Sequence, residues 1–212
     1  RADWIDRVFG PRKYYLISLV IVLYALLPFF MAFEGRKPEV RELVVLATMI
    51  ALATAGRAAF FMTPSFKPII AIVIISAIAF GAEAGFLVGS MTMLVSNFLF
   101  GQGPWTPWQM FAMGFIGFLS GILYRLRILP TKRLQLSVYG FLVTFMIYGG
   151  IMNPAALFMS VYQFSWSGLL AIYISGVPVD LVHASSTFLF LWIGAKPLLE
   201  KLQRIKVKYG LL

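Results

Sequence analysis

The chain has 212 residues, of which 60% are hydrophobic and 12% are charged, and its formal net charge is +10. A soluble domain carries about twice that share of charged residues, so the composition excludes an ordinary soluble domain. Apolar residues form long blocks with basic residues between them. This pattern favours a polytopic helical protein in contact with the lipid bilayer, and it argues against nucleic acid as a partner. Cysteine is absent, which excludes disulfides and thiolate metal sites.

Eight apolar blocks follow one another along the chain. They lie at about 14–33, 43–62, 69–80, 84–100, 110–126, 134–152, 155–175 and 179–195. A helix needs ~20 residues to cross the hydrocarbon core, so most of the blocks are long enough to span it. The first block exceeds the ~7–15 residues of a signal-peptide core, and we interpret it as a membrane segment.

Basic residues predict the orientation of the spans. If 155–175 does not cross and the N-terminus is outside, twelve basic residues lie in the cytoplasm and five outside. If all eight blocks cross, the counts are ten and seven. The positive-inside rule favours the first arrangement. It predicts a multi-pass cell-membrane protein with a cytoplasmic C-terminus. Residues 1–37 would form a basic segment and an extra apolar helix, and 38–212 a six-span core with a non-crossing capping segment at about 155–176.

A ladder of small residues marks the second block. Its members recur every four residues: Ala47, Ala51, Ala55 and Ala59. Such stripes let membrane helices approach closely, so the ladder indicates either packing within the bundle or a docking face for a partner. Arg57 falls on the opposite face of the same helix, at ~100° per residue. It is expected to face the protein interior, or alternatively to reach the outer headgroups.

The segment Asn97 to Gln109, with two glycines and two prolines, predicts a rigid, non-helical connection on the outer face. Its tryptophans, Trp105 and Trp108, suit either an interfacial belt or a ligand surface. Amide side chains accompany them at Asn97, Gln102 and Gln109. Together these groups would suit a large, partly planar ligand that forms hydrogen bonds.

Two further sets of side chains are candidates for ligand contact. The first set lies in and beside the seventh block, which is either a polar, aromatic cap over the outer end of the bundle or an ordinary interfacial helix. Its members are Tyr148, Asn153, Tyr162, Gln163 and Trp166. The second is Asp180 with His183. Asp180 is expected to cap a helix or to lie favourably at its positive end, and the pair has either a structural role or a ligand contact. One histidine without cysteine does not build a usual transition-metal site, so no metal and no resident cofactor are predicted.

Motifs for catalysis are missing from the sequence. There is no GxxxxGK[ST] loop for ATP, no HExxH and no GxSxG. The chain is therefore predicted to be a binder or conduit and not an enzyme. An integral-membrane enzyme that modifies lipid and a structural membrane adaptor are the rival interpretations from other classes.

Several segments together resemble the substrate-binding S-component of energy-coupling factor (ECF) vitamin transporters. They are the alanine ladder, FKPI before the third block, GAEAGFLVG, GQGPWTPWQMFAMGFIGFLSGIL and GVPVDLVHASSTFLFLW. The resemblance covers about residues 38–208. Within the family the chain most resembles the cobalamin-specific S-component of lactobacilli, while a folate or a queuosine precursor is the alternative ligand.

The resemblance implies an all-α, six-helix membrane unit that captures a vitamin from outside. It implies docking through Ala47, Ala51, Ala55 and Ala59 onto a transmembrane coupling subunit driven by two ATPase subunits. Substrate contacts would come from the regions around Arg57, Asn97–Gln109 and Tyr148–Trp166. The block at 14–33 is an addition to the family pattern.

Overall fold

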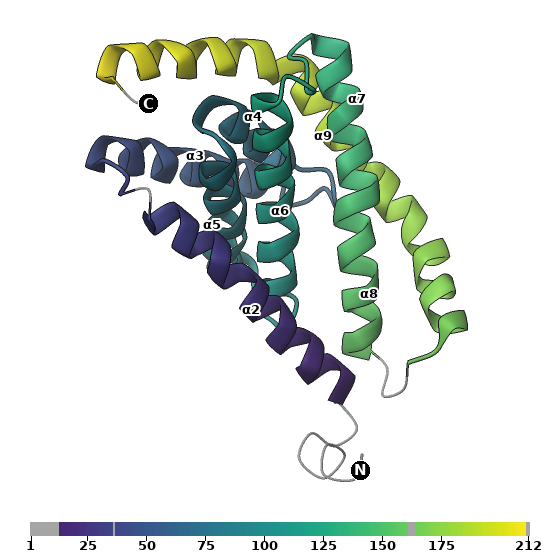
Figure 1. Cartoon of the computed structure of the whole chain (residues 1–212). Coiled ribbons are helices and arrows are strands. Elements are labelled where there is room, and N and C mark those ends of the chain that lie inside the picture. The colour runs from purple at the N-terminus through teal and green to yellow at the C-terminus, as the bar shows by residue number, and fades with distance from the viewer. Residues whose placement is uncertain (1–12, 36, 161–163, 211–212) are drawn as a thin grey trace.

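The computed structural model describes residues 13–35, 37–160 and 164–210, and every regular element in these ranges is a helix (Figure 1). In chain order the elements are α2 (Lys13–Gly35), α3 (Val40–Ala59), α4 (Ile69–Phe80), α5 (Ala82–Phe100), α6 (Thr106–Arg125), α7 (Arg133–Val143), the π-helical turn η2 (Thr144–Tyr148), α8 (Gly149–Ser160) and α9 (Trp166–Tyr209).

Within the described residues, six helices are long and apolar enough to cross a membrane. They are α2, α3, α5, α6, the continuous helix formed by α7, η2 and α8, and α9, and the shorter apolar helix α4 lies among them. The predicted fold class is therefore confirmed as an all-α integral membrane protein. The core runs from α3 to α9, and α2 is the extra N-terminal helix.

The centre of the molecule is formed by α4, α5 and α6. All twelve residues of α4 are buried, because this helix is apolar on every side and is surrounded by its neighbours. Glycines bring α5 and α6 together: a Cβ atom at Gly117 would collide with the carbonyl of Gly85, and one at Gly89 would collide with the backbone of Met113. Small residues thus set the close contact between these two membrane helices.

Helix α2 runs along the outside of this centre (Figure 1), and aromatic rings form the contact. The ring of Phe29 stacks on that of Phe86 with centroids 4.2 Å apart, and it meets Phe118 edge-on at 4.9 Å. Ring pairs of this geometry are favoured by the aromatic quadrupole, beyond the gain from burial. The extra helix is therefore attached to both α5 and α6.

The connection between α5 and α6 is shorter than the sequence predicts. The expectation that all of Asn97–Gln109 is non-helical is wrong, because α5 continues to Phe100 and α6 begins at Thr106. Gly101, with φ of 112°, ends α5 in a conformation that favours glycine. Pro107 lies in the first turn of α6, where its missing N–H has no helical partner to lose.

The region predicted as a capping segment is also organised differently. Residues 155–160 belong to the end of α8, and α9 begins at Trp166 and continues past 176. Pro154 and Pro178 lie inside these helices and do not end them. Prolines are tolerated within membrane helices because neighbouring groups satisfy the backbone atoms that they free. The described residues of 155–176 thus form no separate capping helix, and their place relative to the bilayer stays a prediction.

Candidate functional site

Arg57 is the centre of a polar network inside the bundle. It lies on the face of α3 that contains the fully buried Ala53. Its Nη1 atom donates hydrogen bonds to Ser96 Oγ and Asn97 Oδ1, both at 2.6 Å. The ring of Phe100 lies 5.2 Å from the guanidinium carbon and covers part of the group. The prediction that Arg57 faces the protein interior agrees with this placement.

Asn97 connects three helices through one buried amide. While its Oδ1 accepts from α3, its Nδ2 donates to Thr106 Oγ1 at 2.9 Å and to Gln109 Oε1 at 2.8 Å. The Thr106 hydroxyl in turn donates to Gln102 Oε1 at 2.8 Å. Because Asn97 has no exposed surface, each of these bonds replaces one that water would otherwise supply.

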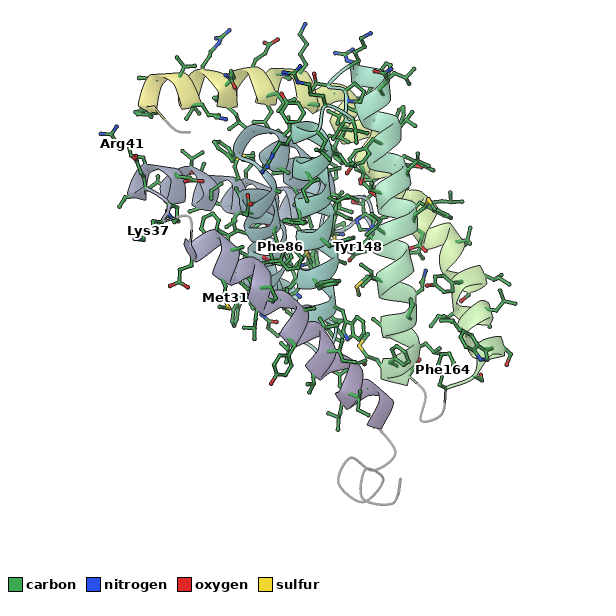
Figure 2. All side chains as sticks on the ribbon, in the orientation of Figure 1. Met31, Lys37, Arg41, Phe86, Tyr148 and Phe164 are labelled. Atoms are coloured by element: carbon green, nitrogen blue, oxygen red, sulfur yellow. The ribbon has the colours of Figure 1, made fainter. Side chains whose placement is uncertain are left out.

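Tyr148 extends the network towards α9. It ends the π-helical turn, which departs from the regular helical repeat, and such turns are frequent at functional sites. Tyr148 lies on the α7–α8 helix where that helix passes α6 (Figure 2). Its hydroxyl interacts with Gln109 and lies near Arg57. Its ring meets His183 edge-on, with centroids 4.7 Å apart.

Asp180 joins the network from the side of α9. The prediction that it caps a helix is wrong, because α9 begins at Trp166 and Asp180 lies well inside it. Its Oδ2 accepts a hydrogen bond from Asn153 Nδ2 at 2.7 Å. A Cβ atom at Gly149 would lie 2.7 Å from this carboxylate, so glycine there leaves the room that Asp180 occupies.

Lys67 adds a second cation from the connection between α3 and α4. Ser186 Oγ donates to the Lys67 carbonyl at 3.0 Å, which holds this connection against α9. Lys67 Nζ donates to the Thr63 carbonyl at 2.9 Å. Burial, and secondarily the positive charge of Arg57, lowers the pKa of Lys67. Lys67 also interacts electrostatically with His183, so the basic groups of the network lie close together.

Most of the predicted site residues meet in this network, and three do not. The structure brings together Arg57, Asn97, Gln102, Gln109, Tyr148, Asn153 and His183. Trp105 is exposed on the 101–105 connection, Trp166 is 77% exposed at the start of α9, and Trp108 packs instead with Val22 of α2. Tyr162 and Gln163 lie outside the described residues.

Three residues of the network were not predicted from the sequence: Ser96, Thr106 and Lys67. Ser96 is adjacent to Asn97, and Thr106 lies within the segment Asn97–Gln109. Both could have been predicted as polar neighbours of the candidate amide residues. Lys67 is a lone basic residue in a loop, and nothing in the local sequence distinguishes it from a topology signal.

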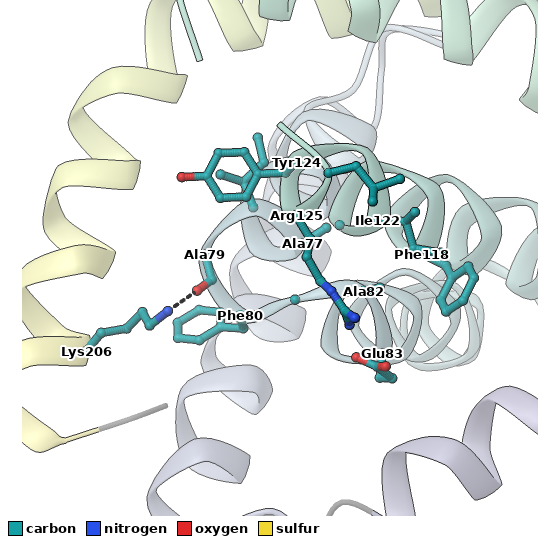
Figure 3. Close-up of a pocket in the computed structure, with 14 residues that line it drawn as sticks. Ala77, Ala79, Phe80, Ala82, Glu83, Phe118, Ile122, Tyr124, Arg125 and Lys206 are labelled. Carbon is teal, nitrogen blue, oxygen red and sulfur yellow. Dashed lines mark hydrogen bonds between the residues drawn. The ribbon is translucent and has the colours of Figure 1, made fainter. Parts of the chain in front are cut away.

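Two of the cavities that the described residues form adjoin α5 or α6 but lie outside the network. One, of about 540 Å³, is almost entirely apolar and lies between α2, α6 and α8, where Trp108 Nε1 is buried without a hydrogen bond to any described residue. The other, of about 660 Å³, lies at the opposite end of α5, where Lys206 Nζ donates to the Ala79 carbonyl at 2.7 Å (Figure 3). Neither cavity is lined by the charged residues of the network.

The alanine ladder lies on the outside of α3. Ala47, Ala51, Ala55 and Ala59 are all exposed, whereas Met49 and Ala53 on the face of Arg57 are buried. The two faces of α3 are thus divided as the spacing predicts. A row of exposed methyl groups of this kind permits close approach by another helix.

Among the described residues no group of three or more His, Cys, Asp or Glu side chains could hold a metal ion. Comparison with known families gives a match. The family model described as "ECF-type riboflavin transporter, S component" matches residues 37–204. Comparison with curated proteins and with solved structures found no match.

Proposed function

Since the matched region covers most of the chain, the protein belongs to the S-component family of ECF-type transporters, and we propose that it captures a vitamin outside the cell. In this proposal it is the substrate-binding subunit of an ATP-driven importer. The family assignment makes it a transport subunit. Helix α2, which precedes the matched region, is an addition to the family's core.

The observation that carries the proposal is the polar network between α3, α5, α6, η2 and α9. Ionisable side chains are costly within membrane spans and normally serve a ligand or a pathway. Here Arg57 binds the end of α5 directly. It is linked to the start of α6 through the Asn97 amide. A few converging polar groups among apolar and aromatic side chains are typical of a small-molecule site.

We propose cobalamin as the ligand, on the basis of the sequence resemblance. Riboflavin is the second candidate, favoured by the description of the matching family model. Both molecules combine a large, partly planar ring system with several hydrogen-bonding groups, which the amides of Asn97 and Gln109 and the ring of Tyr148 would suit.

For partners we propose a transmembrane coupling subunit and two ATPase subunits. The exposed alanine ladder on α3 is the proposed contact with the coupling subunit. In the proposed orientation the C-terminus is cytoplasmic. The α6–α7 connection and the last part of α9 lie at the same end of the bundle (Figure 1). Both segments carry several basic residues, as the positive-inside rule expects of a cytoplasmic end.

Ligand binding to the purified protein tests the proposal. The protein would be purified in detergent, and its equilibrium affinity for cobalamin, riboflavin, folate and a queuosine precursor would be measured by absorbance and calorimetry. Tight, saturable binding of cobalamin supports the first candidate, and preference for riboflavin replaces it with the second. Failure to bind any of these vitamins would contradict the proposed function.

A further inference from the structure

The positive charge of Arg57 has no carboxylate partner among the described residues. Its hydrogen bonds go to a hydroxyl and an amide oxygen, on Ser96 and Asn97. Asp180 is the acidic side chain of the network, but it is held by Asn153 and interacts with Tyr148 and Tyr173 instead of Arg57. A charge within a membrane bundle is normally paired, so this arrangement leaves the charge of Arg57 available for an anion.

The guanidinium also retains unused donors in a favourable geometry. Both of its hydrogen bonds within the described chain start from Nη1, which carries two N–H groups. Nη2 and Nε, with three further N–H groups, make no hydrogen bond to any described residue. These two atoms form the fork that binds the two oxygens of a phosphate or carboxylate in parallel.

A second cation reinforces the same region. Lys67 lies near enough to Arg57 for the two charges to repel, which contributes to the lowered pKa of Lys67. The bond from Ser186 to the Lys67 carbonyl fixes the backbone of this connection against α9. An anion near both cations would relieve their repulsion, and the arrangement is therefore complementary to negative charge.

We propose that Arg57 and Lys67 form a subsite for the oxyanion of the transported ligand, with Arg57 as the bidentate contact. This inference rests on the proposed function. It assigns a chemical class to the ligand: the molecule carries a phosphate or a carboxylate next to its ring system. The phosphodiester of cobalamin meets this requirement, whereas riboflavin, which is uncharged, does not.

Matched ligands with and without a phosphate test the subsite in the full chain reconstituted in lipid nanodiscs. The first pair is cobalamin and cobinamide, which lacks the phosphodiester and its nucleotide. The second is riboflavin 5′-phosphate and riboflavin. We expect the phosphate-bearing member of at least one pair to bind roughly tenfold more tightly or better, since charge-assisted bidentate bonds are among the strongest hydrogen bonds.

Variants assign the preference to the cations. In Arg57→Gln the affinity ratio within the pair should fall towards one. In Arg57→Lys it should be intermediate, because the charge remains but the fork is lost. Lys67→Gln should lower the affinity ratio severalfold. Because Lys67 lies in a loop, its replacement disturbs less packing, and this variant replaces Arg57→Gln as the test if Arg57→Gln does not fold. Arg204→Gln on the exposed side of α9 is the matched control and should leave the ratio unchanged.

The outcomes separate this inference from the proposed function. Equal affinities within both pairs in the unmodified protein, or a preference that survives Arg57→Gln and Lys67→Gln, would overturn the subsite while vitamin binding stands. If no vitamin binds, thermal stabilisation by inorganic phosphate that is lost in Arg57→Gln would support an anion site in a protein of another function. Absence of that stabilisation as well would overturn both.

Discussion

Replacing Asn97 by leucine should destabilise the protein more than any other single change in the network. The substitution places an apolar side chain of similar size at this fully buried position and removes three hydrogen bonds. One is charge-assisted, from Arg57 at 2.6 Å, and two are neutral, to Thr106 at 2.9 Å and Gln109 at 2.8 Å. After the change, these three partners lose the bonds that Asn97 made.

The magnitude follows from these bonds. The bond from the charged group contributes a net ~1.5–3 kcal/mol, and each neutral bond contributes ~0.5–1.5 kcal/mol. The three bonds together therefore contribute at most about 2.5–6 kcal/mol to the free energy of unfolding. Interhelical bonds in membrane proteins average nearer ~0.6 kcal/mol, which gives about 2 kcal/mol for three. We expect a loss of about 2–4 kcal/mol in the free energy of unfolding, between these limits.

Reversible unfolding in mixed micelles with increasing denaturing detergent measures this loss. Gln135→Leu, on the exposed side of α7, is the control and should stay within about 0.5 kcal/mol of the unmodified protein. If Asn97→Leu also stays within that limit, the network contributes nothing to stability and the reasoning from its geometry is refuted.

Three further predictions concern docking, binding and the extra helix. Ala51→Trp should leave vitamin affinity unchanged but abolish uptake by the assembled transporter, because close helix contact is lost. Ala32→Trp on exposed α2 is the control. Normal uptake by Ala51→Trp would show that the ladder is not the docking face. Gln109→Ala should weaken vitamin binding by ~1–3 kcal/mol in calorimetry, whereas the exposed Trp105 should cost less on replacement by alanine; the reverse order would move the site to the loop. Phe29→Ala should lower the unfolding free energy by about 1–3 kcal/mol through loss of ring packing, and an unchanged unfolding curve would show that α2 is not attached as described.

Long apolar blocks were sufficient to predict most of the helices. The block at 69–80 coincides with α4, since Pro68 precedes it and Gly81 follows it, and both residues limit a helix. The ladder also predicted the two faces of α3, because a repeat of four residues fixes which side chains share a face. The spacing of the ladder was therefore sufficient to predict that Arg57 faces the interior.

The side chains at the start of α6 could not be assigned in the same way. Trp108 and Gln109 are consecutive, so they diverge by ~100° once the chain is helical, and one faces α2 while the other faces the network. The glycines and prolines of this stretch predicted a non-helical connection, for which no such angle applies. Likewise, the apolar block at 179–195 suggested a helix start near Asp180, but α9 begins at Trp166 and continues through Pro178.

Reconstitution in liposomes with labelled cobalamin and labelled riboflavin tests the central claim most directly. The chain alone should bind its vitamin saturably and should not accumulate it, with or without ATP or ion gradients. Addition of the coupling subunit and the two ATPase subunits should produce uptake that depends on ATP. Concentrative uptake by the chain alone would contradict the account of this protein as a dependent substrate-binding subunit.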